Sequence, residues 1–262
     1  MDLGIKGRKA LVTGAVGGIA AASVKLLAEA GVDLVLTDVK KSAKDLGNLA
    51  KKYDADAITA DLSCVSGIKT FIDNVGTDFD ILLHTAGITG AKGDPLTMAE
   101  DDWMEAYNLD FMSAVRLGRH LGPAMVKRGW GRFVFITSEN VAQPYPEETV
   151  YNASKSALLS WSKSVAMKHS GSGLMSNCVA PAFIETDMTD GMMNKRADEL
   201  GCTVEEAVES FLKEERPYLI VGRRGKPAEV APVIALLCSE HASFITGSNY
   251  RVDGGAVGSI NI

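Results

Sequence analysis

The chain has 262 residues, 46% of them hydrophobic, and a formal net charge of −6. This is enough for one large domain with a substantial core, and the acidic balance gives no basis for a nucleic-acid or anionic-membrane partner. The four cysteines, at 64, 178, 202 and 238, show no metal-ligand spacing, and Cys178 and Cys238 lie in apolar runs. No apolar run is as long as a membrane span. We expect a cytoplasmic protein without a metal and without a secretory signal.

Short apolar runs rich in β-branched residues alternate along the chain with longer segments of helical pattern. The runs that predict strands cover 8–13, 32–38, 55–60, 79–84, 132–137, 176–180 and 249–252. The segments that predict helices cover 17–30, 42–52, 100–128, 149–168 and 227–238.

This alternation predicts an α/β fold, a doubly wound seven-stranded parallel sheet of the Rossmann type with helices on both faces. Ligands of such sheets bind at the carboxyl ends of the strands. We expect a single dinucleotide-binding domain over 1–262. The Met-, Glu- and Arg-rich segment 183–224 is long for a connection and has two weak helical patterns, so it predicts a lid over the substrate.

A glycine-rich turn, TGAVGGIA at 13–20, follows the first predicted strand and opens a helix. Gly14 and Gly18 let the backbone turn tightly and approach a pyrophosphate, and the helix N-terminus offers free N–H groups. We therefore predict a dinucleotide site at Gly14, Val16, Gly18 and Ile19. The alternative is a tight turn without a ligand.

Two aspartates follow the next strands. Asp38 ends the second strand, where a carboxylate accepts hydrogen bonds from a ribose diol and repels a 2′-phosphate, which favours NAD over NADP. Alternatively it caps the next turn, and Lys40 and Lys41 could loosen the preference. Asp61 and Leu62 follow the third strand and are expected near the adenine, although Asp61 could equally cap a helix.

Tyr151 and Lys155 are four residues apart at the start of a helical segment, so they share one face. A nearby ammonium lowers the pKa of a phenol, which would make Tyr151 an acid/base. Ser138 ends a central strand and would hydrogen-bond the same substrate oxygen. This set predicts hydride transfer at carbon coupled to proton transfer at Tyr151. Such a pair of Tyr and Lys also occurs by chance.

These motifs, together with Ala86-Gly87, YNASK at 151–155, APAFIETDM at 180–188 and RVDGG at 251–255, resemble the short-chain dehydrogenase/reductase superfamily over nearly the whole chain. The resemblance implies that Tyr151 is the acid/base, Ser138 orients the substrate oxygen, and Lys155 binds the nicotinamide ribose and lowers the Tyr pKa. It also implies cofactor contacts at Ala86, Gly87, Pro181, Ile184 and Thr186, and a homotetramer.

Some positions depart from the family pattern. Ala20 and Ala182 replace glycines, and His84-Thr85 replace two asparagines. We expect His84 to be a core residue hydrogen-bonded to backbone rather than a catalytic base. Asp110 stands where the family has an Asn that holds a water on the path from the Lys to solvent. We predict a proton-relay role for Asp110 and note that its carboxylate could pair with Lys155.

The substrate wall is predicted from Gln143, Tyr145, Phe183 and Met188, with Ser138 and Tyr151 at its base. The leading function is NAD(H)-dependent interconversion of a small secondary alcohol and a ketone. One alternative is an NADPH-dependent 3-oxoacyl thioester reductase. Such an enzyme would need a basic patch on its surface to bind the carrier protein that holds the substrate. The other is a dinucleotide-binding regulator without turnover. The tail at 256–262 is expected at a subunit interface.

Overall fold

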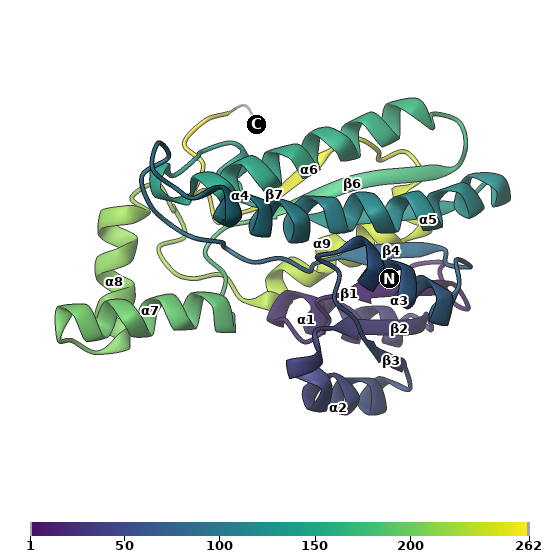
Figure 1. Cartoon of the computed structure of the whole chain (residues 1–262), viewed down its shortest axis with the longest axis horizontal. Coiled ribbons are helices and arrows are strands. Elements are labelled where there is room, and N and C mark those ends of the chain that lie inside the picture. The colour runs from purple at the N-terminus through teal and green to yellow at the C-terminus, as the bar shows by residue number, and fades with distance from the viewer. Residues whose placement is uncertain (1, 261–262) are drawn as a thin grey trace.

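The computed structural model describes residues 2–260 and contains one seven-stranded sheet in which every neighbouring pair of strands is parallel (Figure 1). The strand order is β3-β2-β1-β4-β5-β6-β7. The predicted doubly wound sheet is therefore confirmed. In chain order the strands are β1 Lys9–Thr13, β2 Asp33–Asp38, β3 Asp56–Thr59, β4 Ile81–His84, β5 Gly131–Ile136, β6 Leu174–Pro181 and β7 Asn249–Val252.

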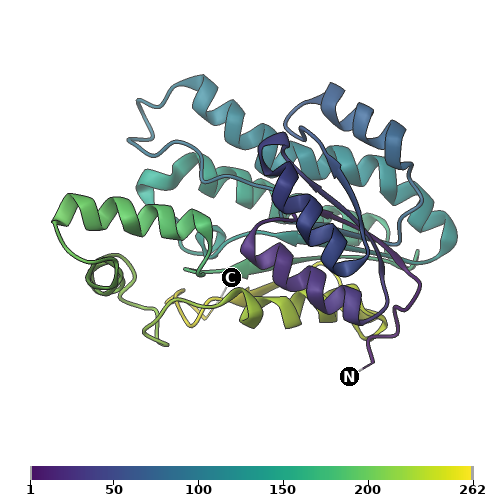
Figure 2. The same cartoon turned by 90° about the horizontal axis from the view of Figure 1, so that it is seen from below.

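Helices cover both faces of the sheet, as Figures 1 and 2 show. On one face pack α1 Gly18–Glu29, α2 Ala43–Tyr53 and α9 Pro227–Cys238. On the other pack α3 Val65–Val75, α5 Ser113–Arg128 and α6 Thr149–Lys168. Helix α3 was not among the predicted helices. The central strands β4 and β5 are buried along their whole length, since helices cover them on both sides.

The segment predicted as one helix over 100–128 has three parts. It consists of α4 Glu100–Ala106, a π-helical stretch Tyr107–Met112, and α5. Single π-turns inside α-helices are rare and often occur at functional sites. Here the π-turn carries Asp110, which is fully buried. The irregular stretch thus lies at the position where the sequence departs from the family pattern.

Two further helices, α7 Asp187–Leu200 and α8 Val204–Glu215, extend from the end of the sheet where the chain leaves β6 (Figure 1). They correspond to the two weak helical patterns predicted within 183–224. A separate small core of Phe183, Met193, Phe211, Leu219 and Ala256 holds this part together. The segment is therefore a packed unit with its own buried side chains.

The end of the chain is partly covered. Ala256 and Val257 are buried within this chain, whereas Ile260 is almost fully exposed; Asn261 and Ile262 of the predicted interface tail lie outside the described residues. The homotetramer stays a prediction. Cys178 and Cys238 are fully buried, as expected. Across residues 2–260, no helix is long and apolar enough to cross a membrane, and no group of metal-binding side chains occurs.

Candidate active site

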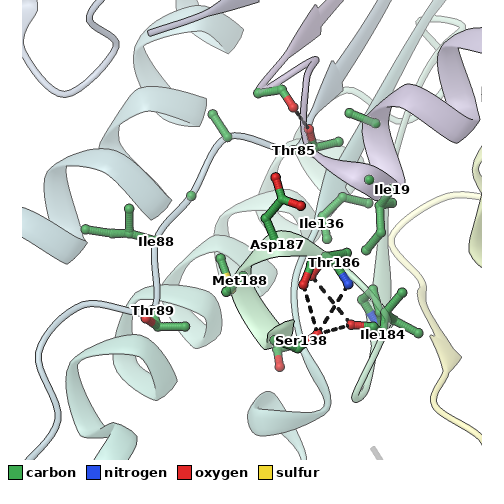
Figure 3. A pocket seen from close by; sticks show the side chains of 18 of the residues that line it. Ile19, Thr85, Ile88, Thr89, Ile136, Ser138, Ile184, Thr186, Asp187 and Met188 are labelled. Atoms are coloured by element: carbon green, nitrogen blue, oxygen red, sulfur yellow. Dashed lines mark hydrogen bonds between the residues drawn. The ribbon is translucent and has the colours of Figure 1, made fainter. Parts of the chain in front are cut away.

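A cavity of about 570 Å³ opens at the carboxyl ends of the strands. Figure 3 shows the segment with Ile88 and Thr89 facing the start of α7, with Thr186, Asp187 and Met188. Most predicted site residues line this one cavity: Gly14, Val16, Gly18, Ile19, Asp38, Leu62, Ala86, Gly87, Ser138, Tyr151, Lys155, Pro181, Phe183, Ile184, Thr186 and Met188. Asp61, Asp110, Gln143 and Tyr145 are not among the lining residues.

The glycine-rich turn has the properties that a pyrophosphate needs. Gly14 has φ +60°, and a Cβ there would lie 2.9 Å from the backbone of Ala86. Within the described chain, no side chain caps the N-terminus of α1 and no acidic residue occupies its first turn. The first N–H groups of α1 therefore remain available to an anion. The residues present fit a dinucleotide.

The Asp38 carboxylate is held in place at the end of β2. Its Oδ2 accepts a hydrogen bond of 3.1 Å from the N–H of Val16, and its Oδ1 accepts one of 2.8 Å from the N–H of Val39. These bonds tie the carboxylate to the glycine-rich turn. Lys41 also lines the cavity nearby. An acceptor of fixed position and an adjacent cation thus stand together where a ribose would bind.

Asp61 does not line the cavity, and its contact with the adenine stays a prediction. The Asp61 carboxylate accepts hydrogen bonds from the hydroxyl (2.6 Å) and the N–H (2.9 Å) of Ser63, which lower the pKa of the carboxyl. Nor does Asp61 cap α3, because Cys64 takes that position and its Sγ accepts from the N–H of Gly67. Its neighbour Leu62 does line the cavity.

Ser138 follows β5 and is buried in a network of polar side chains. Its Oγ lies 3.0 Å from Glu139 Oε2 and 2.8 Å from Asn140 Oδ1, and its single proton can be donated to either acceptor. Burial raises the pKa of Glu139 to about 7, although Arg216 opposes this rise. The sequence analysis missed Glu139 and Asn140, yet both line the cavity directly after the serine.

Tyr151 differs from the expectation in its ionisation. Burial of the hydroxyl raises the pKa of Tyr151 above its ordinary value, the carboxyls of Asp110 and Glu139 raise it further, and the Ser138 hydroxyl opposes them. The predicted lowering by Lys155 is therefore wrong for this arrangement. The Lys155 amine does lie 5.4 Å from the centre of the Tyr151 ring. Burial and the nearby carboxyls set the direction of the shift, which favours the protonated phenol.

The carboxylate of Asp110 is buried close to Lys155. Its Oδ1 accepts a hydrogen bond of 2.7 Å from the N–H of Ile88, and its Oδ2 has no hydrogen-bond partner in the described part of the chain. Burial raises the pKa of Asp110 to about 6, while the charge of Lys155 opposes that rise. The two residues interact through their charges and make no direct hydrogen bond. Asp110 lies behind the cavity wall at Gly87.

His84 is a core residue, as expected, but its partners are side chains and not backbone groups. Its Nδ1 lies 2.9 Å from the Thr13 hydroxyl and its Nε2 lies 3.0 Å from the Ser113 hydroxyl. Burial, together with the smaller effect of the Lys155 charge, lowers the pKa of His84 to about 3. The ring is therefore neutral and joins β4 to β1 and α5.

Gln143 and Tyr145 lie behind the predicted substrate wall. Gln143 Nε2 donates to the Tyr145 hydroxyl at 3.3 Å. The Tyr145 ring packs 3.5 Å from the guanidinium carbon of Arg216, which does line the cavity. Tyr145 thus supports the wall from outside. Arg216 comes from the end of α8 and has no signal in the sequence, because only the packing of the α7–α8 segment brings it there.

Comparison with known proteins identifies the family. The family model described as enoyl-(acyl carrier protein) reductase matches residues 14–257. Nodulation protein G of Rhizobium meliloti is 34% identical over 96% of this chain and 97% of its own length. The 3-oxoacyl-[acyl-carrier-protein] reductase of Aquifex aeolicus is 33% identical over 97% of this chain and 99% of its own.

The chain belongs to the short-chain dehydrogenase/reductase family. A solved structure of L-sorbose reductase from Gluconobacter frateurii, complexed with NADPH and L-sorbose, superposes with a TM-score of 0.90 at 29% identity and covers 99% of this chain and all of its own. The short-chain dehydrogenase/reductases are oxidoreductases that bind a nicotinamide dinucleotide. This chain is of their 3-oxoacyl-reductase-like type.

Proposed function

We propose that the protein is an NAD(H)-dependent oxidoreductase that interconverts a secondary alcohol and a ketone. The observation that carries this proposal is the convergence of Ser138, Tyr151 and Lys155 on one cavity that begins at the glycine-rich turn. A protein that only bound a dinucleotide would have no need of a buried phenol, an amine and a hydroxyl at the far end of that cavity.

Each side chain has one task in the proposed reaction. When bound, the dinucleotide supplies or accepts the hydride. Tyr151 gives a proton to the substrate oxygen or takes one from it, and Ser138 hydrogen-bonds the same oxygen. Lys155 donates a hydrogen bond of 3.1 Å to the carbonyl of Ile136, which holds its amine beside the phenol and beside the expected position of the ribose. A phenol that keeps its proton suits the reduction of a ketone.

The choice of NAD(H) rests on Asp38. Its fixed carboxylate supports a ribose diol and opposes a 2′-phosphate. The Gluconobacter relative was solved with NADPH, and Lys41 lines the cavity. The test is fluorescence titration of the protein with NADH and NADPH. Tighter NADH binding, reversed in Asp38→Ser, is the expected result. Tighter NADPH binding by the natural chain would contradict NAD(H) use, and binding of neither would contradict the whole proposal.

Reduction of a 3-oxoacyl thioester by NADPH is the second candidate, because relatives such as the Aquifex reductase bear that name. A carrier-bound substrate would need unpaired surface cations. The basic residues that could form such a patch are Lys127, Arg128, Arg132, Arg223, Arg224 and Lys226. Four of these six are paired with carboxylates: Arg128 with Asp78, Arg132 with Glu240, Arg223 with Glu229, and Arg224 with Asp190. This pairing supports a small-molecule substrate. Turnover of acetoacetyl thioester above that of simple ketones would favour the second candidate.

A further inference from the structure

Two ion pairs lie beside Ser138 on the wall of the cavity. Glu139 Oε1 lies 3.6 Å from Arg216 Nε, and Lys92 Nζ lies 2.7 Å from Glu148 Oε1. All four side chains line the cavity. They come from separate parts of the chain: the loop after β4, the loop after β5, the start of α6 and the end of α8.

The two pairs belong to one hydrogen-bond network that ends at the serine. Asn140 Nδ2 donates to Glu148 Oε2 at 2.7 Å and to Asn152 Oδ1 at 2.8 Å. Because both amide protons of Asn140 are used in this way, its Oδ1 faces the Ser138 hydroxyl. The ion pairs are therefore fixed relative to the hydroxyl that orients the reacting oxygen.

The Glu139–Arg216 ion pair lacks a hydrogen bond although both side chains are buried. Glu139 is 5% exposed and Arg216 is 9% exposed. Within residues 2–260, Nε of Arg216 has no hydrogen-bond partner. A buried ion pair stabilises a fold only when its remaining hydrogen bonds are satisfied, and an unpaired buried donor is costly. The guanidinium is nevertheless held in place against the Tyr145 ring. A guanidinium held in this way on the cavity wall is positioned to donate to a polar ligand.

The charges of this wall select among substrate classes. Its two cations are matched by two carboxylates, and elsewhere in the cavity lining Asp38 and Asp187 are balanced by Lys41 and Lys155. An anionic substrate would find both cations of this wall already paired. A hydrocarbon substrate would displace water from the charged groups and offer no hydrogen bonds in its place. A neutral molecule with hydroxyls beside the reacting carbon can donate to the glutamates and accept from Arg216 and Lys92.

We propose that the substrate is a neutral polyol or the polyhydroxy ketone derived from it, with Glu139–Arg216 and Lys92–Glu148 as the specificity-determining pairs. This inference rests on the proposed alcohol–ketone chemistry and narrows it to one substrate class. In reduction, the carbonyl carbon would receive a hydride with its two electrons from the reduced dinucleotide, the C=O π bond would open, and the oxygen would take the proton of Tyr151, which solvent would then replace; oxidation is the reverse. The neighbouring hydroxyls of the substrate stay unchanged and bind to the two pairs.

The test compares kcat/KM for D-sorbitol, D-mannitol and xylitol with that for cyclohexanol, and for fructose with that for cyclohexanone. The assays use saturating NAD or NADP, and NADH or NADPH. We expect the best polyhydroxy substrate to exceed the simple one by about a hundredfold or more, because a site built for hydroxyls discriminates strongly against analogues that lack them. Simple substrates that react equally well or better would overturn the inference while leaving the alcohol–ketone proposal intact. Turnover of neither class would overturn both.

Variants then assign the selectivity to the ion pairs. Arg216→Met and Glu148→Gln should each raise KM for the polyhydroxy substrate, and should lower its advantage over the simple one by about tenfold or more. Arg196→Met is the matched control: Arg196 lies on α7, pairs with Glu214 and also contacts Phe211, but does not line the cavity. It should leave both activities unchanged. An unchanged advantage in both Arg216→Met and Glu148→Gln would overturn the assignment, and the milder Glu148 variant decides the matter where Arg216→Met does not fold.

Discussion

The amine of Lys155 on α6 donates a hydrogen bond of 3.1 Å to the backbone carbonyl of Ile136 at the end of β5. This bond joins the helix that carries the phenol to the strand that leads into Ser138. The amine is buried, so the side chain has little freedom to leave this position. The relative placement of the three proposed catalytic groups therefore depends on packing at the end of the sheet as well as on their spacing in the sequence.

Gly87 has no side chain, and this leaves space for the buried groups of Asp110 and Lys155. A Cβ at Gly87 would lie 2.8 Å from Asp110 Oδ1 and 3.1 Å from Lys155 Nζ. We expect Gly87→Ala to lower kcat and to destabilise the fold by about 1–3 kcal/mol, because neither buried group can move away freely. Steady-state kinetics and urea unfolding measure both effects.

Gly47 provides the matched control for that substitution. It lies inside α2, and a Cβ there would contact nothing within 4 Å. Gly47→Ala should raise the free energy of unfolding by up to about 1 kcal/mol with no change in kcat, since alanine favours the helix. Equal behaviour of the two alanine variants would show that the space around Gly87 is not restricted.

Tyr151→Phe should lower kcat by about 10²–10⁴-fold, the usual contribution of a general acid or base. Binding of NADH or NADPH, measured by fluorescence, should stay close to that of the natural chain, because only the hydroxyl is removed. Tyr53→Phe at the end of α2, away from the cavity, serves as the control. Retained turnover in Tyr151→Phe would remove the phenol from the mechanism.

Asp110→Asn should change how stability depends on pH. Burial raises the pKa of Asp110 to about 6 from 3.8, so the carboxyl binds its proton more tightly in the folded protein than in the unfolded chain. This tighter proton binding contributes fully to the stability of the fold below about pH 4, and the contribution is lost as the pH rises through 6. The free energy of unfolding of Asp110→Asn, relative to the natural chain, should therefore rise by up to about 3 kcal/mol between pH 4 and pH 8. A difference independent of pH would show that the carboxyl is not perturbed.

His84→Gln should weaken the fold at pH 7 by about 1–3 kcal/mol, because the ring links two buried hydroxyls. The folded pKa of His84 is about 3, below the ordinary 6.5, so its contribution is present above pH 6.5 and is lost as pH falls toward 3. The variant should show less acid destabilisation over that range in urea unfolding. The exposed His120 is the control, and His120→Gln should change stability by less than about 0.5 kcal/mol at pH 7.

Local patterns were enough to predict the sheet and to name most of the predicted residues that line the one cavity. The strands were visible as short apolar runs, and Ser138, Tyr151 and Asp38 stand at strand ends or at helical spacing, which sequence alone defines. Asp61 does not line the cavity, and its carboxylate accepts a hydrogen bond from the Ser63 hydroxyl, a local contact that the sequence analysis did not consider.

Other features depend on contacts between distant segments. Arg216 reaches Glu139 only through the packing of α7 and α8, so no spacing could indicate the pair. The direction of the pKa shift of Tyr151 could not be predicted from the sequence either. It depends on the burial of the hydroxyl and on two carboxyls, Asp110 and Glu139, that come from the π-helical stretch and from the loop after β5.

The small core of Phe183, Met193, Phe211, Leu219 and Ala256 shares no residue with the two cores on the faces of the sheet. Substitutions on the buried side of α7 and α8 are therefore accommodated within that core, and Arg216, at the end of α8, is the position where the segment contacts the polar network around Ser138. The sheet with its helices and the α7–α8 segment therefore have separate hydrophobic cores. Chimeras that receive α7 and α8 from a relative would be a direct way to transfer substrate range between enzymes.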